Sequence, residues 1–350
     1  MKRILFSAMA AIGLSLFSNN VDARSWRINS KPEAKANFLS IEKATSSSDV
    51  LNGDTLYLDP GCLLTSSQQV RKSVTIIGTG YNLKNVTEET LINLHITSSN
   101  VKIEGCYLNS LYIYGGKGIS NIVIERCKVV GSINLGDSYT TINNIKINSC
   151  YISGELIHER GTVLDVDISN CIIKGRIDNF SYSTFTNNTI LCSKKGALLT
   201  NIQNSKISNN IILNTSTEYA TDGDQQTDSY SNYTIANVSV SDNNTITNNV
   251  LSTDASHAFA DHPDNKFIGA KPEDVFTMQG TEEERYRLKA DSPAKGYGYN
   301  GCDCGAYDGM FPYVVSGHPH FLPYVENAVV SDRPIDGKIN VKLKIKVQNE

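Results

Sequence analysis

The sequence repeats itself about every 21 residues between positions 100 and 213, and this repeat constrains the fold more than any other feature. Its clearest lines begin at Val101, Ile122, Ile145 and Val166, and each reaches a cysteine five residues later. Weaker copies carry asparagine at that position. The equivalent residues are Cys106, Cys127, Cys150, Cys171, Asn188, Asn210 and Asn249, with steps of 21, 23, 21, 17, 22 and 39. A fixed short period indicates stacked units, and the long last step indicates an insertion.

Each repeat carries three short strand signals. Alternation in the first places Val101 and Ile103 on one face and Lys102 on the other. The second follows each line, as at Leu111 and Ile113, and the third precedes the next line. Three strands per repeat predict an all-β solenoid, a parallel β-helix whose coils pair at about 4.8 Å. Lys102 and Lys128 take outward positions, so replacing either is expected to change stability little.

The copies at residues 121–127 and 208–212 resemble the coil consensus of secreted bacterial right-handed parallel β-helix proteins of the pectate-lyase-like class. The resemblance covers roughly residues 50–310 and implies a single-stranded, right-handed β-helix. Residues 288–307, with Ser292-Pro-Ala294 and Asp303-Cys-Gly305-Ala306, resemble the element that ends the stack in such proteins. This fold carries lyases, hydrolases, esterases, adhesins and non-catalytic proteins. The motifs of its polysaccharide lyases and polygalacturonase-like hydrolases are not recognisable here.

The first 23 residues read as a secretory signal peptide. Lys2 and Arg3 precede a short apolar run at 4–17, and cleavage is expected after Ala23. The run is too short to span a bilayer, so the mature chain is expected to be secreted or periplasmic without a membrane span. Cleavage would leave 30 basic and 35 acidic residues. Such a mildly acidic chain lacks the electrostatic footprint of a nucleic-acid-binding protein.

The remaining chain divides into three parts. Residues 24–52 are expected to hold a connector containing Trp26 and an amphipathic helix over 32–50 that caps the first coil. The β-helix is expected over 53–309, with an insertion at 214–239. Residues 310–350 form a C-terminal β tail, in which 339–347 alternate as one strand with a basic face.

The eight cysteines do not indicate a disulfide framework. Four of them share one ladder position, where parallel side chains about 4.8 Å apart exceed the Cβ separation of a disulfide. We expect reduced, buried thiols at these four positions. Cys302-Asp-Cys304 is too closely spaced for an ordinary zinc site.

Chemistry-bearing residues concentrate on the second strand of two neighbouring coils. Register places Glu155 beside Arg176, with the tyrosines further along the same face. Carboxylates, a histidine, an arginine and aromatic rings suit acid–base chemistry on a sugar, although a Glu–Arg rung also satisfies charge on an exposed sheet. The catalytic candidates are Glu155, His158, Glu159, Arg176 and Asp178, and the substrate-binding candidates are Tyr112, Tyr114, Arg160 and Lys174.

Two further acidic groupings are candidates. Glu104 and Glu125 are neighbours on the first strand. Their proximity would either raise the pKa of one carboxyl group or hold a cation. Alternatively, Lys102 and Lys146 balance their charge. Residues 207–265 contain eight acidic residues and no Lys or Arg. The closely spaced carboxylates in this segment indicate either a Ca²⁺-binding loop or a loop exposed to solvent. The metal candidates there are Asp222, Asp224 and Asp228.

Two functions remain open from the sequence. The first is a non-catalytic secreted β-helix that binds a polysaccharide or another cell-surface partner. The second is a polysaccharide lyase or glycoside hydrolase that uses the patch around Glu155 and Asp178.

Overall fold

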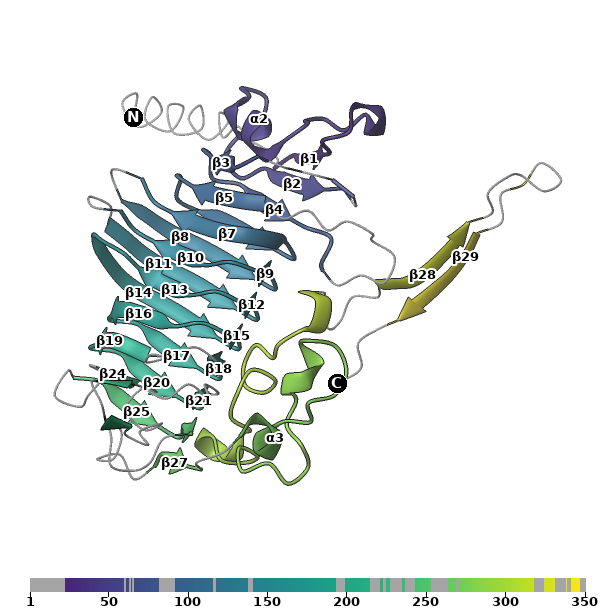
Figure 1. Cartoon of the computed structure of the whole chain (residues 1–350). Coiled ribbons are helices and arrows are strands. Elements are labelled where there is room, and N and C mark those ends of the chain that lie inside the picture. Colours follow the sequence, from purple (N-terminus) through teal and green to yellow (C-terminus); the bar gives the residue numbers. More distant parts are fainter. Residues whose placement is uncertain are drawn as a thin grey trace, which may run out of the picture.

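The computed structural model shows a mostly β chain with two long parallel sheets and, among the described residues, no closed barrel (Figure 1). The predicted signal peptide lies outside the described part except for Ala23. The described residues are 23–59, 61–62, 64, 66–81, 92–115, 118–137, 141–192, 199–214, 221–222, 225–226, 235–236, 243–252, 264–268, 271–317, 324–330, 338 and 341–346.

The first sheet takes one strand from every repeat, and all its pairs are parallel. In spatial order its strands are β1 (Ser25–Ile28), β2 (Thr55–Leu58), β4 (Thr75–Ile77), β6 (Val101–Glu104), β8 (Ile119–Glu125), β11 (Thr141–Asn148), β14 (Thr162–Ser169), β17 (Thr184–Thr186), β20 (Lys206–Ser208) and β25 (Thr245–Thr247).

The second sheet has two columns of parallel strands joined by β7 (Tyr107–Ile113). The first column continues from β7 through β9 (Lys128–Val129), β12 (Tyr151–Ile152), β15 (Ile172–Ile173), β18 (Thr189–Cys192), β21 (Ile211–Asn214), β26 (Val250–Leu251) and β27 (Lys266–Phe267). The second column holds β3 (Gln68–Val70), β5 (Ile92–Ile96), β7, β10 (Ile133–Leu135), β13 (Leu156–His158), β16 (Ile177–Ser181), β19 (Leu199–Gln203) and β24 (Ile235–Ala236).

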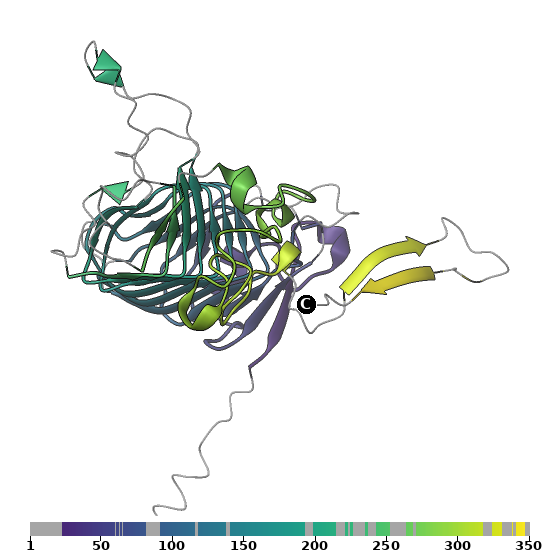
Figure 2. The same ribbon diagram turned by 90° about the horizontal axis from the view of Figure 1, so that it is seen from below.

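The strand register confirms the repeat. Val101 pairs with Ile122, Ile122 with Ile145 and Ile145 with Val166. The weaker copies continue the series, because β17 pairs with β20 and β20 with β25. The long last step therefore holds extra residues, as predicted, but Asn214 in β21 and Ile235–Ala236 in β24, both inside the predicted bounds 214–239, pair within the stack. Inward side chains form one apolar core along the stack, from Ile28 to Leu251. Figure 2, which looks along the stack, shows both sheets surrounding this interior.

Left-handed residues make two sharp corners in most repeats. From β6 to β25, the corner after each first-sheet strand has φ between 50° and 62°, and a second corner, before or within the strand, has φ between 50° and 61°. Such values favour Gly and Asn, which explains the Asn-rich spacers. The residues after the strand are Gly105, Arg126, Ser149, Asn170, Asn187, Asn209 and Asn248. The second corner precedes the strand at Asn100, Tyr182, Asn204 and Asn243, and lies within β8, β11 and β14 at Asn121, Asn144 and Asp165.

The ladder of cysteine and asparagine side chains, which follows the corner after each first-sheet strand, contains the expected buried thiols. Cys106, Cys127, Cys150 and Cys171 are buried free thiols, which confirms that prediction. In the asparagine part, each side-chain oxygen accepts from a neighbouring repeat, as from Asn188 N–H to Asn210 Oδ1 at 2.9 Å. Asn265 adds a further member, because its Oδ1 accepts from Asn249 N–H at 2.9 Å. The sequence did not reveal Asn265, which lies only 16 residues after Asn249.

The N-terminal segment differs from the expected connector and long helix. Its first part is strand β1, held because the Asp54 carboxylate accepts from Arg24 N–H at 2.9 Å and Trp26 Nε1–H at 2.7 Å. The helical part is short and comprises a 3-10 helix, η1 (Pro32–Ala34), and α2 (Ile41–Ser46). Phe38 lies outside both helices, forms a β-bridge with Ile28 and packs against Trp26.

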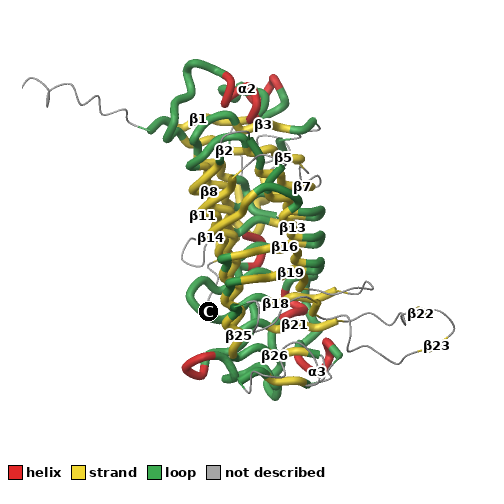
Figure 3. Tube along the Cα trace, turned by 90° about the vertical axis from the view of Figure 1, so that its left-hand side faces the viewer, coloured by secondary structure: helices red, strands yellow, loops and turns green. Residues whose placement is uncertain are grey.

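Helix α2 nevertheless lies at the end of the stack, as Figure 3 shows. Thr45 Oγ1 donates to Gln69 O at 3.0 Å, and Glu42 N–H donates to Gln68 Oε1 at 3.2 Å. Both acceptors belong to β3. The helix therefore covers the first strand of the second column.

Residues 271–317, here called the strap, run along the side of the stack (Figure 1). The sequence predicts that residues 288–307 end the stack. In the structure they lie along its side instead, because the corner residues of successive repeats provide hydrogen-bond partners for the strap. Gly305 N–H donates to Asn209 O at 2.9 Å, and Ser149 Oγ donates to Phe311 O at 2.8 Å. The strap contains α3 (Pro272–Val275) and the 3-10 helices η4 (Glu284–Tyr286), η5 (Tyr299–Gly301) and η6 (Val315–Gly317).

Apolar residues of the first column explain why the strap is needed. Tyr151, Ile172, Ile211 and Val250 point away from the main core yet are fully buried. They pack in two smaller clusters with strap residues such as Phe276, Ala306 and Tyr313. A strand buried on both faces is apolar at consecutive positions, as Ile172-Ile173 is.

The predicted C-terminal strand pairs within the chain. β29 (Val341–Lys346) and β28 (Tyr324–Val330) form an antiparallel hairpin that projects from the stack in Figures 1 and 2. Within the insertion, β22 (Thr221–Asp222) and β23 (Gln225–Gln226) also pair antiparallel.

Candidate functional site

The outward face of the second column carries the candidate site. Buried residues such as Leu111 and Leu156 alternate with side chains that point outward. Pairing aligns one outward residue from each strand into a row that crosses six repeats. The row consists of His95, Tyr112, Asn134, Ile157, Asp178 and Thr200.

One end of this row is aromatic. The His95 ring stacks on Tyr112 with centroids 4.8 Å apart and an interplanar angle of 13°. Tyr114 meets His95 edge-on, and its hydroxyl lies 2.8 Å from His95 Nδ1. All three side chains are partly exposed. They form an aromatic cluster in which a hydrogen bond holds His95 and Tyr114 together.

The other end of the row is charged. Arg176 lies 3.9 Å from the Glu155 carboxylate and 3.7 Å from that of Asp178. Asp178 Oδ1 also accepts from Thr200 Oγ1 at 2.6 Å and from Asn201 Nδ2 at 2.9 Å. Arg176 Nε is buried without a hydrogen-bond partner among the described residues. The predicted contact between Glu155 and Arg176 is therefore present, and Asp178 joins it.

The structure separates several candidates that the sequence grouped together. Tyr112 and Asp178 are three strands apart in the row, about 14 Å. Glu159 and Arg160 are exposed at the turn after β13. Lys174 instead lies 3.4 Å from Glu282 of the strap. The charged patch thus consists of Glu155, Arg176 and Asp178.

His158 lies at the edge of this patch. Its Nδ1 is 2.9 Å from Asn179 O, while its Nε2 is buried without a partner among the described residues. Asn179 Nδ2 in turn donates to His158 O at 3.0 Å. These contacts hold the ring against Asn179, a residue within β16 whose φ is 68°.

The sequence did not identify four residues of the row, which are Asn134, Ile157, Thr200 and, at its aromatic end, His95. The segment 92–96 precedes the clean repeats, so it was not aligned with Tyr112. Alternation of Ile92, Leu94 and Ile96 with polar residues is the signal that places His95 outward.

Within the glutamate pair on the first sheet, the pKa of Glu104 is lowered rather than raised. Burial by itself would raise the pKa of Glu104, but the hydrogen bond from Lys102 and the charge of Arg126 hold it below its ordinary value of 4.5. Lys102 Nζ lies 2.9 Å from Glu104 and 3.0 Å from Glu125. Of the alternatives that the sequence left open, balance by neighbouring cations is the one observed, because Lys102 contacts both carboxylates and Arg126 contacts Glu104.

The predicted calcium loop lies largely outside the described part of the chain. Asp224 and Asp228 fall outside it, and for Asp222 only its backbone position in β22 is described. Across the described ranges, no group of three or more His, Cys, Asp or Glu side chains is arranged to hold a metal ion.

No protein-family model matches the chain, and no curated protein is significantly similar to it in sequence. Within the part of the chain that the structure covers, no helix has the length and apolar character needed to cross a membrane.

Proposed function

We propose that this protein is a secreted right-handed parallel β-helix of the pectate-lyase-like kind, which binds a polysaccharide along the second column. The repeat, the two long parallel sheets and the sequence resemblance support the fold. The charged start and apolar run of residues 1–23 support secretion.

The observation that carries the binding function is the row from His95 to Thr200. A sugar ring presents an apolar C–H face and a polar rim, so it packs on an aromatic ring and hydrogen-bonds at its edge. The stacked rings of His95 and Tyr112 offer the first contact. Further along the row, Asn134, Asp178 and Thr200 offer the second.

The row also suits an extended ligand. Its residues recur at the strand spacing of about 4.8 Å, so a polymer lying along the stack meets a side chain in each repeat. Arg176 offers a cation for an acidic sugar, although Glu155 and Asp178 share it.

Calorimetric titration with soluble oligosaccharides, both neutral and acidic, tests this function. We expect saturable binding of at least one oligosaccharide of several residues, and weaker binding of shorter ones. An absence of binding across both classes would reject a carbohydrate ligand.

A polysaccharide lyase or glycoside hydrolase at the same face is the second candidate. It is favoured by the contact of two carboxylates, Glu155 and Asp178, with one guanidinium. Incubation with acidic polysaccharides should then release unsaturated or reducing ends, and Glu155→Gln or Asp178→Asn should abolish the release. Binding without any new chain ends would support the non-catalytic function.

A further inference from the structure

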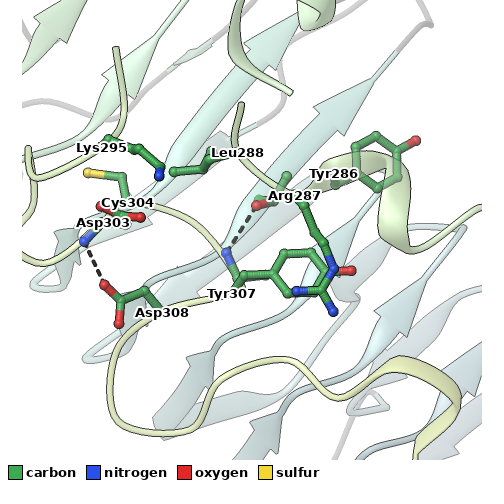
Figure 4. A pocket seen from close by; sticks show the side chains of 10 residues that line it. Tyr286, Arg287, Leu288, Lys295, Asp303, Cys304, Tyr307 and Asp308 are labelled. Atoms are coloured by element: carbon green, nitrogen blue, oxygen red, sulfur yellow. Dashed lines mark hydrogen bonds between the residues drawn. The ribbon is translucent and has the colours of Figure 1, made fainter. Parts of the chain in front are cut away.

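A pocket of about 230 Å³ lies between the strap and β18 (Figure 4). The strap is fixed closely against the repeat here, because Ala306 N–H donates to Thr189 Oγ1 at 3.1 Å. A Cβ on Gly305, whose φ is +94°, would come within 2.7 Å of Ile211 Cδ1. Only glycine allows this approach, so the floor of the pocket is set by backbone contacts.

The cations of the pocket are not held by carboxylates. Arg287 and Lys295 line it and are exposed, and within the described residues neither forms an ion pair. Arg287 lies over the Tyr307 ring, 4.4 Å from its centroid, as Figure 4 shows.

The carboxylates of the pocket, in contrast, are tied to the backbone. Asp308 accepts from Asp303 N–H and from Gly309 N–H, each at 2.7 Å. Asp303 Oδ1 accepts from Gly296 N–H at 2.8 Å. Backbone amides of the strap therefore hold these two carboxylates in place, whereas the two cations are available to an incoming anion.

The remaining wall is aromatic and apolar. Tyr307 and Leu288 line it, and the Tyr307 hydroxyl donates to Glu283 O at 2.8 Å, which fixes the ring. A volume of 230 Å³ corresponds to roughly seven or eight water molecules. That is below the range of about 300–1,000 Å³ typical of drug-sized ligands.

We propose that this pocket binds a single sugar acid, with its carboxylate at Arg287 and Lys295 and its C–H face on Leu288. Asp303 also lines the pocket, and its carboxylate is placed to accept from a sugar hydroxyl. The pocket shares no residue with the second-column face, so the proposal does not depend on the function proposed above.

Titration of the full chain with glucuronate, and with glucose as the same ring without a carboxylate, tests the proposal. We expect glucuronate to bind at least tenfold more tightly than glucose, because the carboxylate forms charge-assisted hydrogen bonds. Arg287→Gln and Lys295→Gln should each weaken glucuronate binding about tenfold. Lys289→Gln is the matched control, since Lys289 lies 3.7 Å from Asp291 and does not line the pocket.

Equal affinities for glucuronate and glucose would overturn the proposal, as would no binding of glucuronate or full binding by both variants. If Arg287→Gln fails to fold by circular dichroism, Lys295→Gln, at an exposed side chain, decides alone. Loss of glucuronate binding in Tyr112→Ala but not in Arg287→Gln would assign the ligand to the second-column face instead.

Discussion

Residues at the corners of the repeat accept an unfavourable backbone conformation. Arg126, Ser149 and Tyr182 have φ between 50° and 53°, although each carries a Cβ. The left-handed conformation costs such residues about 1–2 kcal/mol. Arg126 and Ser149 gain contacts there, with Glu104 and Phe311 respectively. Tyr182 has 60% of its surface exposed, so it gains little packing in return.

Replacing Tyr182 with asparagine should therefore stabilise the protein by about 1 kcal/mol, because asparagine tolerates the left-handed region. Urea unfolding of the two proteins measures the difference. Ser181→Asn, one residue earlier in β16, is the control and should bring no gain. A variant no more stable than the wild type would show that the corner is not strained.

The lowered pKa of Glu104 predicts an acid-dependent contribution to stability. A carboxyl whose pKa is lower in the folded than in the unfolded state stabilises the fold above its unfolded pKa, near 4.5. That contribution is lost as the pH falls through the lower folded pKa. Glu104→Gln should cost about 1 kcal/mol at pH 7 and almost nothing under strongly acidic conditions.

Unfolding midpoints of wild type and Glu104→Gln as a function of pH check this prediction. In a Lys102→Met background the pH dependence of the difference should be smaller, because one of the cations is gone. A constant difference from neutral to acidic pH would contradict the assigned cause.

At the scale of the element, the asparagine ladder shows how neighbouring repeats are joined. Asn188, Asn210 and Asn249 are fully buried. Asn210 Oδ1 accepts from both the backbone N–H and the side-chain amide of Asn188. Asn188 Oδ1 accepts from Cys171 N–H at 2.9 Å, where the cysteine ladder begins.

Asn210→Ala should consequently destabilise the protein more than Asn188→Ala. The first change leaves two buried donors of Asn188 without this acceptor, and the second leaves one, at about 1–3 kcal/mol for each unsatisfied group. Denaturant midpoints of the two variants decide the order. An equal or smaller loss for Asn210→Ala would mean that the two donors of Asn188 do not depend on Asn210 as their acceptor.

The sequence predicted the elements wherever one residue type returned at a fixed place. Alternation gave the inward residues of the first sheet, and the cysteine and asparagine positions gave the register. It missed β1 and Asn265 because each lies outside the regular lines. The contact of Glu155 with Arg176 followed from register, whereas the direction of His158 depends on its contacts with Asn179 within β16, for which the period gives no information.

Lys128 shows the same limit on what the repeat alone can predict. Its position in the repeat is outward, and solvent exposure was expected, but only 9% of its side chain is exposed. The strap covers this face from about 150 residues further along the chain. Consecutive apolar residues such as Ile172-Ile173 signal a covered face, but they do not identify what covers it.

At the scale of the whole molecule, Lys128 joins the stack to the strap. Its ammonium lies 3.5 Å from Glu282, between the rings of Tyr107 and Tyr151 at 5.6 and 5.4 Å. Lys128→Met should cost about 1–2 kcal/mol, contrary to the small effect expected from the repeat alone. Lys146→Met, at an exposed outward position, is the control in thermal unfolding. Similar losses for both would mean that the strap contact contributes little.

The long axis of the stack brings His95, Tyr112 and Asp178 from separate repeats into one row, and the proposed function depends on that row. Its most direct test is the dissociation constant of the tightest-binding oligosaccharide for Tyr112→Ala and Tyr182→Ala. Loss of an aromatic contact should weaken binding by Tyr112→Ala roughly two- to tenfold. Tyr182→Ala, which removes an exposed tyrosine outside the row, should bind like the wild type. Unchanged affinity in Tyr112→Ala, or equal losses in both variants, would contradict binding at the second column.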